Sequence, residues 1–372
     1  MCAERPTETL KLPLEGILRS SGDARVRALG VRGGMAHIQL EQSGGVQLAN
    51  ATRTPEAGAN SMPAEVTAPW CATLLGAEVN LHQLRRLLAF FATQGWDTGD
   101  VDTLAQRPDR TVLRWQLQPR EPLQFAAAKH ACLHLAGELN ADLVLQPGHS
   151  QRPPRLAGFD MDSTLIDAEV IDELAKITGV GAEVAAITEA AMRGELDFRQ
   201  SFKKRMGLLR GFPETELAQI ARQLPLKSGA GELLRALKTL GCKTAILSGG
   251  FSYFANFLQA ERLPVDLVHA NQLQFAGGKL TGEVVEPIVD AMGKRALLEG
   301  MAGEMGLELD RVIAVGDGAN DIPMLSLGAL GIAIHPKPKV RLEAPQAISR
   351  FGLDAALYLF GLNDQQIRAL LP

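Results

Sequence analysis

The sequence contains no segment that would send it into or across a membrane. The opening stretch MCAERPTETLKLPLEG lacks the uninterrupted apolar run of a signal peptide. No later apolar run reaches the roughly 20 residues that a membrane-spanning helix needs. The default expectation is therefore a cytoplasmic protein.

Cysteine is scarce and forms no recognisable pattern. The four cysteines, Cys2, Cys71, Cys132 and Cys242, show neither a CxxC pair nor metal-ligand spacing. A chain of 372 residues does not need disulfide bonds to fold. We expect reduced, mostly buried thiols.

A strong net charge is also missing. Lys and Arg number 38 against 42 Asp and Glu, a formal net charge of −4. This balance gives no general reason to bind nucleic acid or an anionic membrane, so any anion site has to be local. No GxGxxG motif follows the first strand expected after residue 155, which argues against a nucleotide-binding Rossmann enzyme.

The chain is longer than one typical domain, and polar stretches containing proline divide it. PGHSQRPPR at 147–155 marks the main boundary, because neither a helix nor a central strand tolerates its three prolines. ATRTPEAGANSMPAE at 51–65 is typical of a linker or long loop. The expected domains are 1–60, of uncertain structure, 66–147 and 155–372.

Segment 66–147 has the pattern of a ferredoxin-like α+β domain. Strand-like CATLLG precedes the amphipathic run HQLRRLLAFFATQGW, and two more strand-like pieces lead to a second helix, FAAAKHACLHLAGELN, and to ADLVLQ. This is a βαββαβ order. Segment 1–60 holds one hairpin-like piece, VRALGVRGGMAHIQL, with Gly33 and Gly34 at its turn.

After residue 155 the pattern changes to short apolar runs separated by helices. RLAGF, KTAIL, VDLVHA, RVIAV and LGIAI are uniformly apolar, as strands buried on both faces of a parallel sheet are. We therefore expect a doubly wound α/β fold. NQLQFAGGKLTGEVV predicts a β-hairpin turning at Gly277 and Gly278, and 169–224 predicts a helical insertion.

Polar motifs follow three of these strands: DMDST at 160–164, SGG at 248–250 and GDGAND at 316–321. Ligands bind at the carboxyl ends of the strands in open α/β sheets, so we expect the motifs to converge on one crevice. DxDxT alone occurs by chance in about one chain in 20 of this length, but GDGxND fixes five positions and occurs in on the order of one in 10,000.

FDMDSTL, SGG, a downstream lysine at Lys294 and GDGANDIPML match, in order, the four motifs of the haloacid dehalogenase superfamily. Within it, residues 155–360 resemble the phosphoserine phosphatases. The resemblance implies a Mg²⁺-dependent enzyme that hydrolyses O-phospho-L-serine to L-serine and phosphate through an aspartyl-phosphate, the last step of serine biosynthesis.

The first motif supplies the candidate catalytic carboxylates. Asp160 is anionic at neutral pH and can attack phosphorus without an activating base. The leaving serine oxygen needs a proton donor, and Asp162 is the candidate general acid and base. Asp162 points the same way as Asp160 only if the strand has already ended at Asp160, which the resemblance implies.

Several carboxylates facing a phosphate would repel it unless a cation intervened, and an oxygen-rich site favours Mg²⁺. Asp160 and Asp317 are the expected side-chain ligands. The resemblance adds the backbone carbonyl of Asp162, places Asp321 at or behind the ligands, and makes Asn320 an expected substrate contact.

Phosphate oxygens need hydrogen-bond donors and positive charge. Ser248 follows an apolar strand and is expected to open a helix, where its hydroxyl and the amides of Gly249 and Gly250 can hold phosphate. The resemblance assigns Lys294 to the transferring phosphoryl group. Spacing alone leaves Arg295 as a competing position.

The insertion at 169–224 resembles the small helical cap that closes over such active sites. Phosphoserine carries an ammonium and a carboxylate away from its phosphate, so the cap has to supply one anion and one cation. By family position these are Glu169 and Arg205, although the two lysines before Arg205 compete by composition. Met192 and Phe198 resemble the apolar lining of the pocket.

In front of such an enzyme, segment 66–147 resembles the ACT regulatory module. This implies a homodimer and L-serine or another amino acid as effector. The turn AEVNLHQL lacks the glycine usual in ACT domains, so a dimerisation domain without a ligand is the alternative. Segment 1–60 is a candidate second, degenerate copy.

Two other functions remain open at this point. The same nucleophile and metal would serve a phosphotransferase or a phosphatase for another small monoester, because the core motifs fix the reaction class and not the substrate. The alternative of another class is a catalytically inactive regulatory or assembly protein. The presence of every motif residue argues against that function.

Overall fold

The computed structural model describes residues 7–13, 24–32, 35–41, 70–148, 152–193, 195–328 and 330–371. The chain divides into two compact units. The amino-terminal unit comprises Met1–Gln151 and Leu357–Arg368, and the carboxyl-terminal unit comprises Arg152–Ala356 and Ala369–Pro372. The junction at 151–152 lies inside the proline-containing stretch, whereas the expected linker at 51–65 lies outside the described residues.

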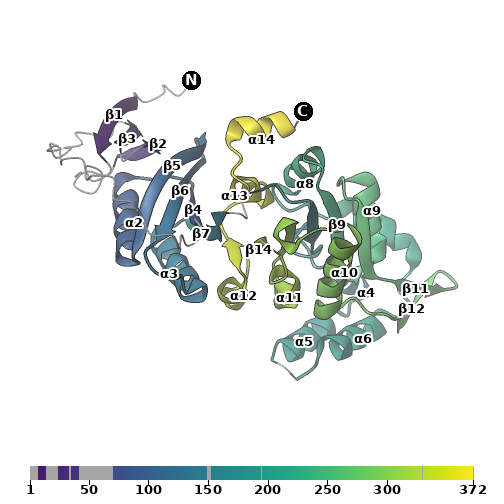
Figure 1. Ribbon diagram of the computed structural model, residues 1–372. Helices are drawn as coiled ribbons and strands as arrows, with labels where there is room; N and C mark the ends of the chain where they lie inside the picture. The colour runs from purple at the N-terminus through teal and green to yellow at the C-terminus, as the bar shows by residue number, and fades with distance from the viewer. Residues whose placement is uncertain are drawn as a thin grey trace. The chain divides into compact units, whose positions relative to one another are not determined.

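A seven-stranded antiparallel sheet, ordered β1-β3-β2-β5-β6-β4-β7, forms the amino-terminal unit. Its main part has the βαββαβ order, and α2 and α3 lie on one face of the sheet, where apolar side chains of both helices and of the strands form a common core (Figure 1). These elements are β4 (Trp70–Gly76), α2 (Leu81–Thr93), β5 (Trp96–Arg107), β6 (Arg110–Pro119), α3 (Phe125–Glu138) and β7 (Asp142–Pro147).

Three further strands extend the same sheet: β1 (Thr7–Pro13), β2 (Arg25–Arg32) and β3 (Met35–Glu41). The predicted hairpin is present, since β2 pairs antiparallel with β3, although Gly33 and Gly34 lie outside the described residues. β2 joins β5 through Val31 and Val101. The described strands of segment 1–60 thus belong to the sheet of the following segment, which lends no support to a separate second copy.

Leu357–Arg368 completes the amino-terminal unit. Arg114 and Gln146 donate hydrogen bonds to the carbonyl of Leu359 at 2.8 and 3.0 Å, and Arg107 pairs with Asp364 at 2.6 Å. From the sequence, these residues were expected in the domain 155–372. Their partners explain the difference, because the polar side chains of β5, β6 and β7 find hydrogen bonds in this segment.

The carboxyl-terminal unit contains a six-stranded parallel sheet of order β10-β9-β8-β13-β14-β15. The five predicted apolar runs each form one of its strands, and the predicted parallel α/β core is confirmed. β15 was not predicted, because three residues are too short for a recognisable apolar run. The strands are β8 (Leu156–Phe159), β9 (Lys243–Phe251), β10 (Leu267–Asn271), β13 (Val312–Gly316), β14 (Leu330–Ile334) and β15 (Gln346–Ile348).

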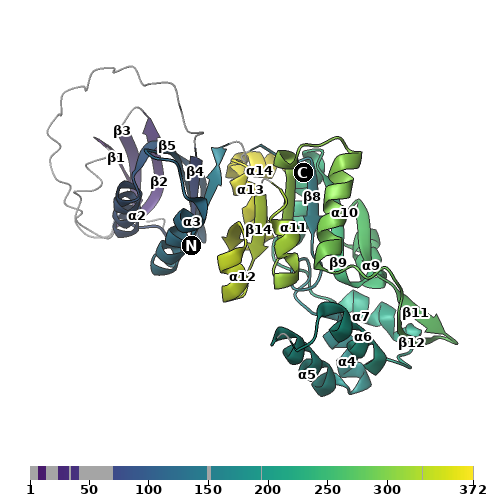
Figure 2. The same cartoon turned by 60° about the horizontal axis from the view of Figure 1, so that its bottom comes forward.

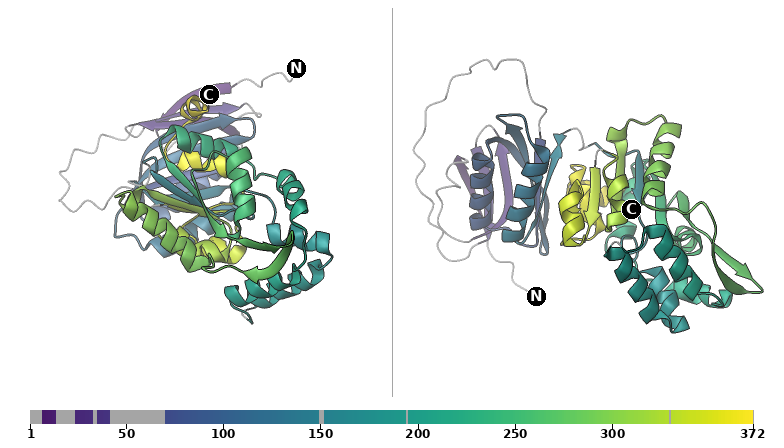
Figure 3. Two further views of the ribbon diagram at one scale, coloured as in Figure 1. Left: turned by 90° about the vertical axis from the view of Figure 1, so that its right-hand side faces the viewer. Right: turned by 90° about the horizontal axis from the view of Figure 1, so that it is seen from below.

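Helices lie around this sheet (Figure 3). They are α8 (Ala230–Thr239), α9 (Ser252–Glu261), α10 (Ala291–Glu304), α11 (Ile322–Leu325) and α12 (Pro338–Glu343). The last two helices of the chain, α13 (Ala356–Leu359) and α14 (Asp364–Leu370), lie mostly in the segment Leu357–Arg368 of the amino-terminal unit. Close packing of α10 depends on Gly158 in β8, because a Cβ there would lie 3.0 Å from the Leu298 side chain. A side chain at Gly158 would force α10 away from the strands.

The predicted helical insertion is present between β8 and β9 as α4 (Val170–Thr178), α5 (Gly181–Met192), α6 (Phe198–Leu208) and α7 (Leu217–Gln223). Figure 2 shows these helices gathered beside the hairpin of β11 (Leu273–Ala276) and β12 (Lys279–Val284). The hairpin turns at the two expected glycines, which have positive φ. It contacts the insertion through hydrogen bonds of 2.8 Å that join Leu280 to Gly211 and Phe212.

The described thiols are as expected. Cys71, Cys132 and Cys242 are buried, and Cys2 lies outside the described residues. Burial raises the pKa of both Cys132 and Cys242 to about 12, which keeps them protonated and unreactive at neutral pH. Among the described residues, no helix is both long and apolar enough to span a membrane.

Candidate active site

The carboxyl ends of β8, β9 and β13 bring the three motifs together. β8 ends at Phe159, and the amide of Asp160 still donates to the carbonyl of Val315 in β13 at 2.9 Å. The chain turns from Asp162 onward, as the resemblance implied. Asp162 then lies against the second motif, because a Cβ on Gly250 would collide with its Oδ2.

A buried lysine lies between two carboxylates. Lys294 Nζ is 2.7 Å from Oδ1 of Asp160 and 2.7 Å from Oδ1 of Asp321. Burial alone would lower the pKa of Lys294, but the two carboxylates outweigh it and raise that pKa, so the ammonium stays charged. Arg295 instead lies 4.0 Å from Glu299, partly exposed to solvent. Of the two basic residues, Lys294 is the one at the motifs.

The pKa of Asp160 is raised, chiefly by burial and then by the neighbouring Asp321 carboxylate, while the Lys294 ammonium opposes the shift. The side chain also accepts a hydrogen bond from the Met161 amide at 2.8 Å. Both this contact and the lysine contact use Oδ1. Neither contact uses Oδ2 of Asp160, so among the described residues this oxygen is available to react.

Asp321 is fully buried, and both of its oxygens are occupied. Oδ1 receives Lys294, and Oδ2 accepts the amides of Asp317 and Gly318 at 3.1 and 3.0 Å. Gly316 makes room for it, since a Cβ there would lie 2.5 Å from Asp321 Oδ2. The glycines of GDGAND thus let the loop fold around this carboxylate.

The acidic cluster fits a hard cation. Carboxylate oxygens of Asp160, Asp317 and Asp321 lie within 4.8 Å of one another. Asp317 accepts a hydrogen bond from Thr164 at 2.9 Å through Oδ1 only, so Asp317 keeps one oxygen for a cation. Burial and the Asp321 carboxylate raise the pKa of Asp317 to about 6, a shift that a bound cation would reverse. Asp317 therefore suits direct ligation better than Asp321, whose two oxygens are both occupied.

Sequence analysis assigned no role to Thr164, the last residue of DMDST. Its buried hydroxyl links the first motif to the third through Asp317. The fixed threonine of the motif was a signal for such a contact, but the identity of its partner required the structure.

Asp162 has the properties of a group that exchanges protons near neutral pH. Burial, followed by the Glu169 carboxylate, raises the pKa of Asp162 to about 7, and a hydrogen bond from the Val170 amide at 3.0 Å opposes the shift. A carboxyl group with such a pKa can both give and take a proton under cellular conditions.

The second motif differs from the expectation in one respect. Ser248 was expected to open a helix, but β9 continues to Phe251 and α9 begins only at Ser252. The strand continues because Asn271 of β10 still pairs with Phe251. The amides of Gly249 and Gly250 therefore lie on extended backbone, where that of Gly250 donates to the buried Ser248 hydroxyl at 2.9 Å.

The cap carries both charged residues that the resemblance indicated. Glu169 precedes α4 and accepts a hydrogen bond from Ser163 at 2.8 Å; desolvation raises its pKa, with Ser163 and Arg205 opposing. Burial lowers the pKa of Arg205, while the carboxylates of Asp172, Glu169 and Asp162 favour its charged form. Its buried Nε has no hydrogen-bond partner among the described residues, so the guanidinium has a donor left for an anion.

Of the remaining predicted contacts, two can be placed in the structure and one cannot. A Cβ on Gly249 would lie 3.1 Å from the Phe198 ring, which places this ring of the cap against the second motif. Asn320 lies next to Asp321, with its Nδ2 3.4 Å from Oδ1. The side chain of Met192 lies outside the described residues.

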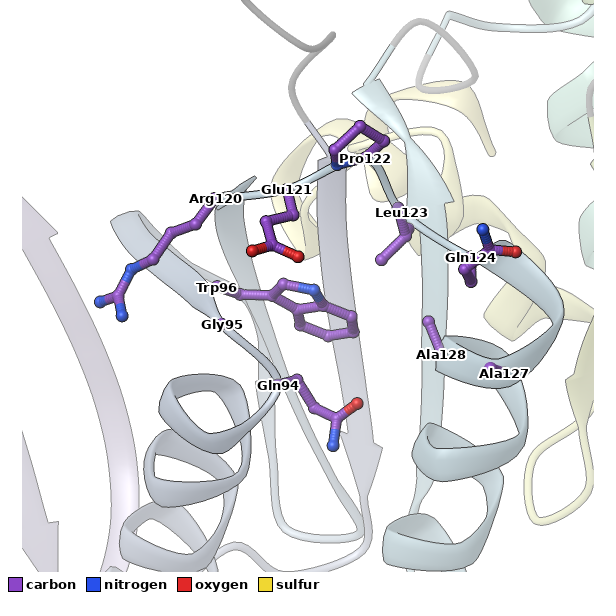
Figure 4. A pocket seen from close by; sticks show the side chains of 10 residues that line it. All are labelled: Gln94, Gly95, Trp96, Arg120, Glu121, Pro122, Leu123, Gln124, Ala127 and Ala128. Atoms are coloured by element: carbon purple, nitrogen blue, oxygen red, sulfur yellow. The ribbon is translucent and has the colours of Figure 1, made fainter.

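A separate hollow lies in the amino-terminal unit. Its volume is about 300 Å³. The Trp96 indole, the start of α3 and the loop before α3 line it (Figure 4). Its lining is part apolar and part polar: Gln94, Gly95, Trp96, Arg120, Glu121, Pro122, Leu123, Gln124, Ala127 and Ala128. No motif in the sequence indicated this hollow.

Known proteins resemble this chain over the part that contains the motifs. Residues 154–327 match the model of the haloacid dehalogenase-like hydrolases. A phosphoserine phosphatase from Haemophilus influenzae is 48% identical over 207 residues, 56% of this chain and 66% of that protein. One from Streptomyces coelicolor is 38% identical over 300 residues, 80% of this chain and 72% of that protein.

A solved structure shares the architecture. The unliganded probable phosphoserine phosphatase from Vibrio cholerae superposes with a TM-score of 0.62 at 32% identity, covering 79% of this chain and 86% of that one. The chain spans just under two thirds of the Haemophilus protein but well over two thirds of the Streptomyces and Vibrio proteins. Sequence identity, coverage and the convergence of the motifs agree: the chain belongs to the phosphoserine phosphatase family of haloacid dehalogenase-like hydrolases.

Proposed function

We propose that the chain is a Mg²⁺-dependent phosphatase that hydrolyses O-phospho-L-serine to L-serine and phosphate, the last step of serine biosynthesis, in the cytoplasm. One observation carries the proposal. Lys294 holds Asp160 through Oδ1 and leaves Oδ2 available, and the proton-exchanging Asp162 lies near enough to affect the ionisation of Asp160.

In the first half of the reaction, Asp160 Oδ2 attacks phosphorus and forms an aspartyl-phosphate. The bond from phosphorus to the serine oxygen breaks, and protonated Asp162 gives its proton to that oxygen. L-Serine then leaves. Asp162 suits this step because its pKa of about 7 leaves a sizeable protonated fraction at neutral pH.

In the second half, Asp162 acts as a base. It takes a proton from a water molecule whose oxygen attacks phosphorus, and the bond to Asp160 Oδ2 breaks. Phosphate leaves, and both carboxyl groups return to their starting states. One group thus serves as acid and then as base.

Positive charge and hydrogen-bond donors hold the phosphoryl group. A bound Mg²⁺ would be held by the Asp317 carboxylate, the backbone carbonyl of Asp162 and the oxygen of Asp160 that does not attack, and it would supply the charge that offsets repulsion between phosphate and carboxylates. Lys294 adds a buried positive charge. The Ser248 hydroxyl, the Gly249 and Gly250 amides and the Asn320 amide group supply donors, while Asp321 holds Lys294 and the loop in place.

Selection of the serine part belongs to the cap. Glu169 takes the ammonium group, and Arg205, with its unpaired Nε, takes the carboxylate. Phe198 covers the substrate next to Gly249, and Met192 is proposed to add apolar lining.

Phosphate release from a panel of monoesters tests the proposal. We expect L-phosphoserine to be turned over with a higher kcat/KM than sugar phosphates. Removal of Mg²⁺ with a chelator should abolish release, and added Mg²⁺ should restore it. Preferred turnover of a sugar phosphate would refute the substrate, and transfer to an added alcohol in place of water would identify a phosphotransferase.

For the amino-terminal unit we propose an ACT-like domain, spanning 66–147, that mediates homodimerisation and binds L-serine or another amino acid. Its antiparallel strand order β7-β4-β6-β5 supports a ferredoxin-like fold, and the hollow beside Trp96 offers room for a small ligand. Sedimentation tests the dimer. L-Serine should inhibit turnover, and Ala127→Trp, which fills the hollow from an exposed helix position, should relieve this inhibition without changing the uninhibited rate.

A further inference from the structure

A buried asparagine outside the motifs connects two parts of the active site. Asn271 is at the end of β10 and only 2% exposed. Its Nδ2 donates to the carbonyl of Gly249 at 2.9 Å, and its Oδ1 accepts the amide of Val289 at 2.7 Å. Both ends of the side chain are therefore used, one on the SGG segment and one on the loop before α10.

The first contact determines the direction of a neighbouring amide. The carbonyl of Gly249 and the N–H of Gly250 belong to one peptide group, and in a trans peptide they point in opposite directions. When Asn271 holds the carbonyl, the N–H of Gly250 points the other way, toward the Ser248 hydroxyl at 2.9 Å. Two consecutive glycines would otherwise be free to rotate this peptide.

The second contact acts on the lysine helix. Val289 precedes Asp290, which caps α10 by accepting the amide of Gly293 at 2.9 Å. The next residue is Lys294, whose ammonium contacts Asp160 and Asp321. One side chain therefore connects the peptide whose N–H contacts the Ser248 hydroxyl with the start of the helix that carries Lys294.

We propose that Asn271 is a positioning residue for phosphoryl transfer. It touches neither substrate nor metal, and it fixes the Gly249–Gly250 peptide relative to Lys294. The inference rests on the proposed function, because it assigns the phosphoryl group to that peptide and that lysine. Loss of the tie should reduce kcat and phosphate affinity, and should leave recognition of the serine part by the cap unchanged.

Asn271→Asp tests the tie. The aspartate keeps an oxygen for the Val289 amide, but it replaces the donor to Gly249 with a second oxygen. We expect kcat to fall by about 10²-fold, the scale of a misplacement near 1 Å, and inhibition by inorganic phosphate to weaken. Inhibition by L-serine at the active site is measured in an Ala127→Trp background, where the hollow of the amino-terminal unit is filled. This inhibition should stay within twofold of its value without the Asn271 change.

Thr244→Val is the matched control. Thr244 is fully buried at the opposite end of the same pair of strands, where its hydroxyl bonds to Asp266 at 3.1 Å. The Thr244→Val variant, like the Asn271 variant, loses a buried hydrogen bond, but this bond is remote from the motifs. We expect a lowered Tm with unchanged kcat. If Asn271→Asp fails to fold, Asn271→Ser takes its place in the same comparison.

The outcomes separate the two proposals. A kcat for the Asn271 variant equal to that of Thr244→Val, both measured below their melting temperatures, would overturn the positioning role alone. Wild-type protein that fails to hydrolyse phosphoserine and other monoesters would overturn the proposed function, whatever the Asn271 variant does.

Discussion

At the residue scale, the site depends on the Asp160 carboxylate, of which one oxygen is fixed by hydrogen bonds and the other is available to react. Lys294 and the Met161 amide fix Oδ1 of Asp160, so the orientation of Oδ2 does not depend on the substrate. Asp160→Asn keeps the shape but removes the negative charge that attacks phosphorus. We expect turnover to fall by at least about 10³-fold, with no aspartyl-phosphate in acid-quenched reactions. Turnover near the wild-type rate would remove Asp160 from the role of nucleophile.

Arg205 shows how one unpaired donor can select a substrate. Its buried Nε lacks a partner among the described residues and faces a region of carboxylates. Arg205→Ala should lower kcat/KM for phosphoserine by about 10- to 100-fold, the value of a charged hydrogen bond, and should affect p-nitrophenyl phosphate much less. Lys204→Ala, an exposed change on the same helix, is the control. Equal losses on both substrates would exclude Arg205 from selection.

At the element scale, the carboxyl end of β9 depends on glycine. A Cβ on Gly250 would collide with Asp162 Oδ2 and would lie 3.0 Å from Met161 Cε. Gly250→Ala should therefore displace the general acid and remove most activity, about 10²-fold or more. Gly300→Ala is the control inside α10: its Cβ would meet nothing within 4 Å, so it should raise the free energy of unfolding by about 0.5–1 kcal/mol with normal kinetics. A fully active Gly250→Ala would contradict the assigned position of Asp162.

Some elements were predictable because their signal is local. The five strands that were predicted are short apolar runs, and the hairpin has two glycines at its turn, so composition alone indicates both. The start of α9 was placed too early, because pairing of Phe251 with Asn271, twenty residues away in the chain, extends β9. The same reason hid Asn271 itself: an isolated asparagine in the sequence does not reveal which backbone groups it joins.

At the scale of the whole molecule, the largest difference from the sequence prediction is the membership of Leu357–Arg368 in the amino-terminal unit. Its contacts join residues far apart in the chain, such as Arg107 and Asp364. The sequence around one of these residues does not indicate that the other is its partner. The motifs of the site, in contrast, could be predicted because each lies at the carboxyl end of its own strand. Which aspartate binds the lysine and which keeps a free oxygen required distances.

The pairing of Asp364 gives the amino-terminal unit a defined dependence on pH. Burial opposes ionisation of Asp364, but hydrogen bonds from Arg107 and Tyr358 outweigh it and lower the pKa of Asp364. A lowered pKa in the folded state means that the unfolded chain binds the proton more tightly. Ionised Asp364 therefore stabilises the fold fully above the pKa that Asp364 has in the unfolded chain, about 4. This stabilisation is lost as the pH falls through the lower pKa of Asp364 in the folded protein.

Asp364→Asn tests this dependence, because it keeps the size of the side chain and removes the titration. We expect the variant to lose about 2 kcal/mol of unfolding free energy at pH 7, the scale of a charged hydrogen bond, and to approach wild type as the pH falls below about 4. Urea unfolding at a series of pH values measures the difference, with Asp109→Asn, in the exposed turn between β5 and β6, as the control. A difference between wild type and Asp364→Asn that stays constant with pH would show that Arg107 and Tyr358 contribute to packing and not to the ionisation of Asp364.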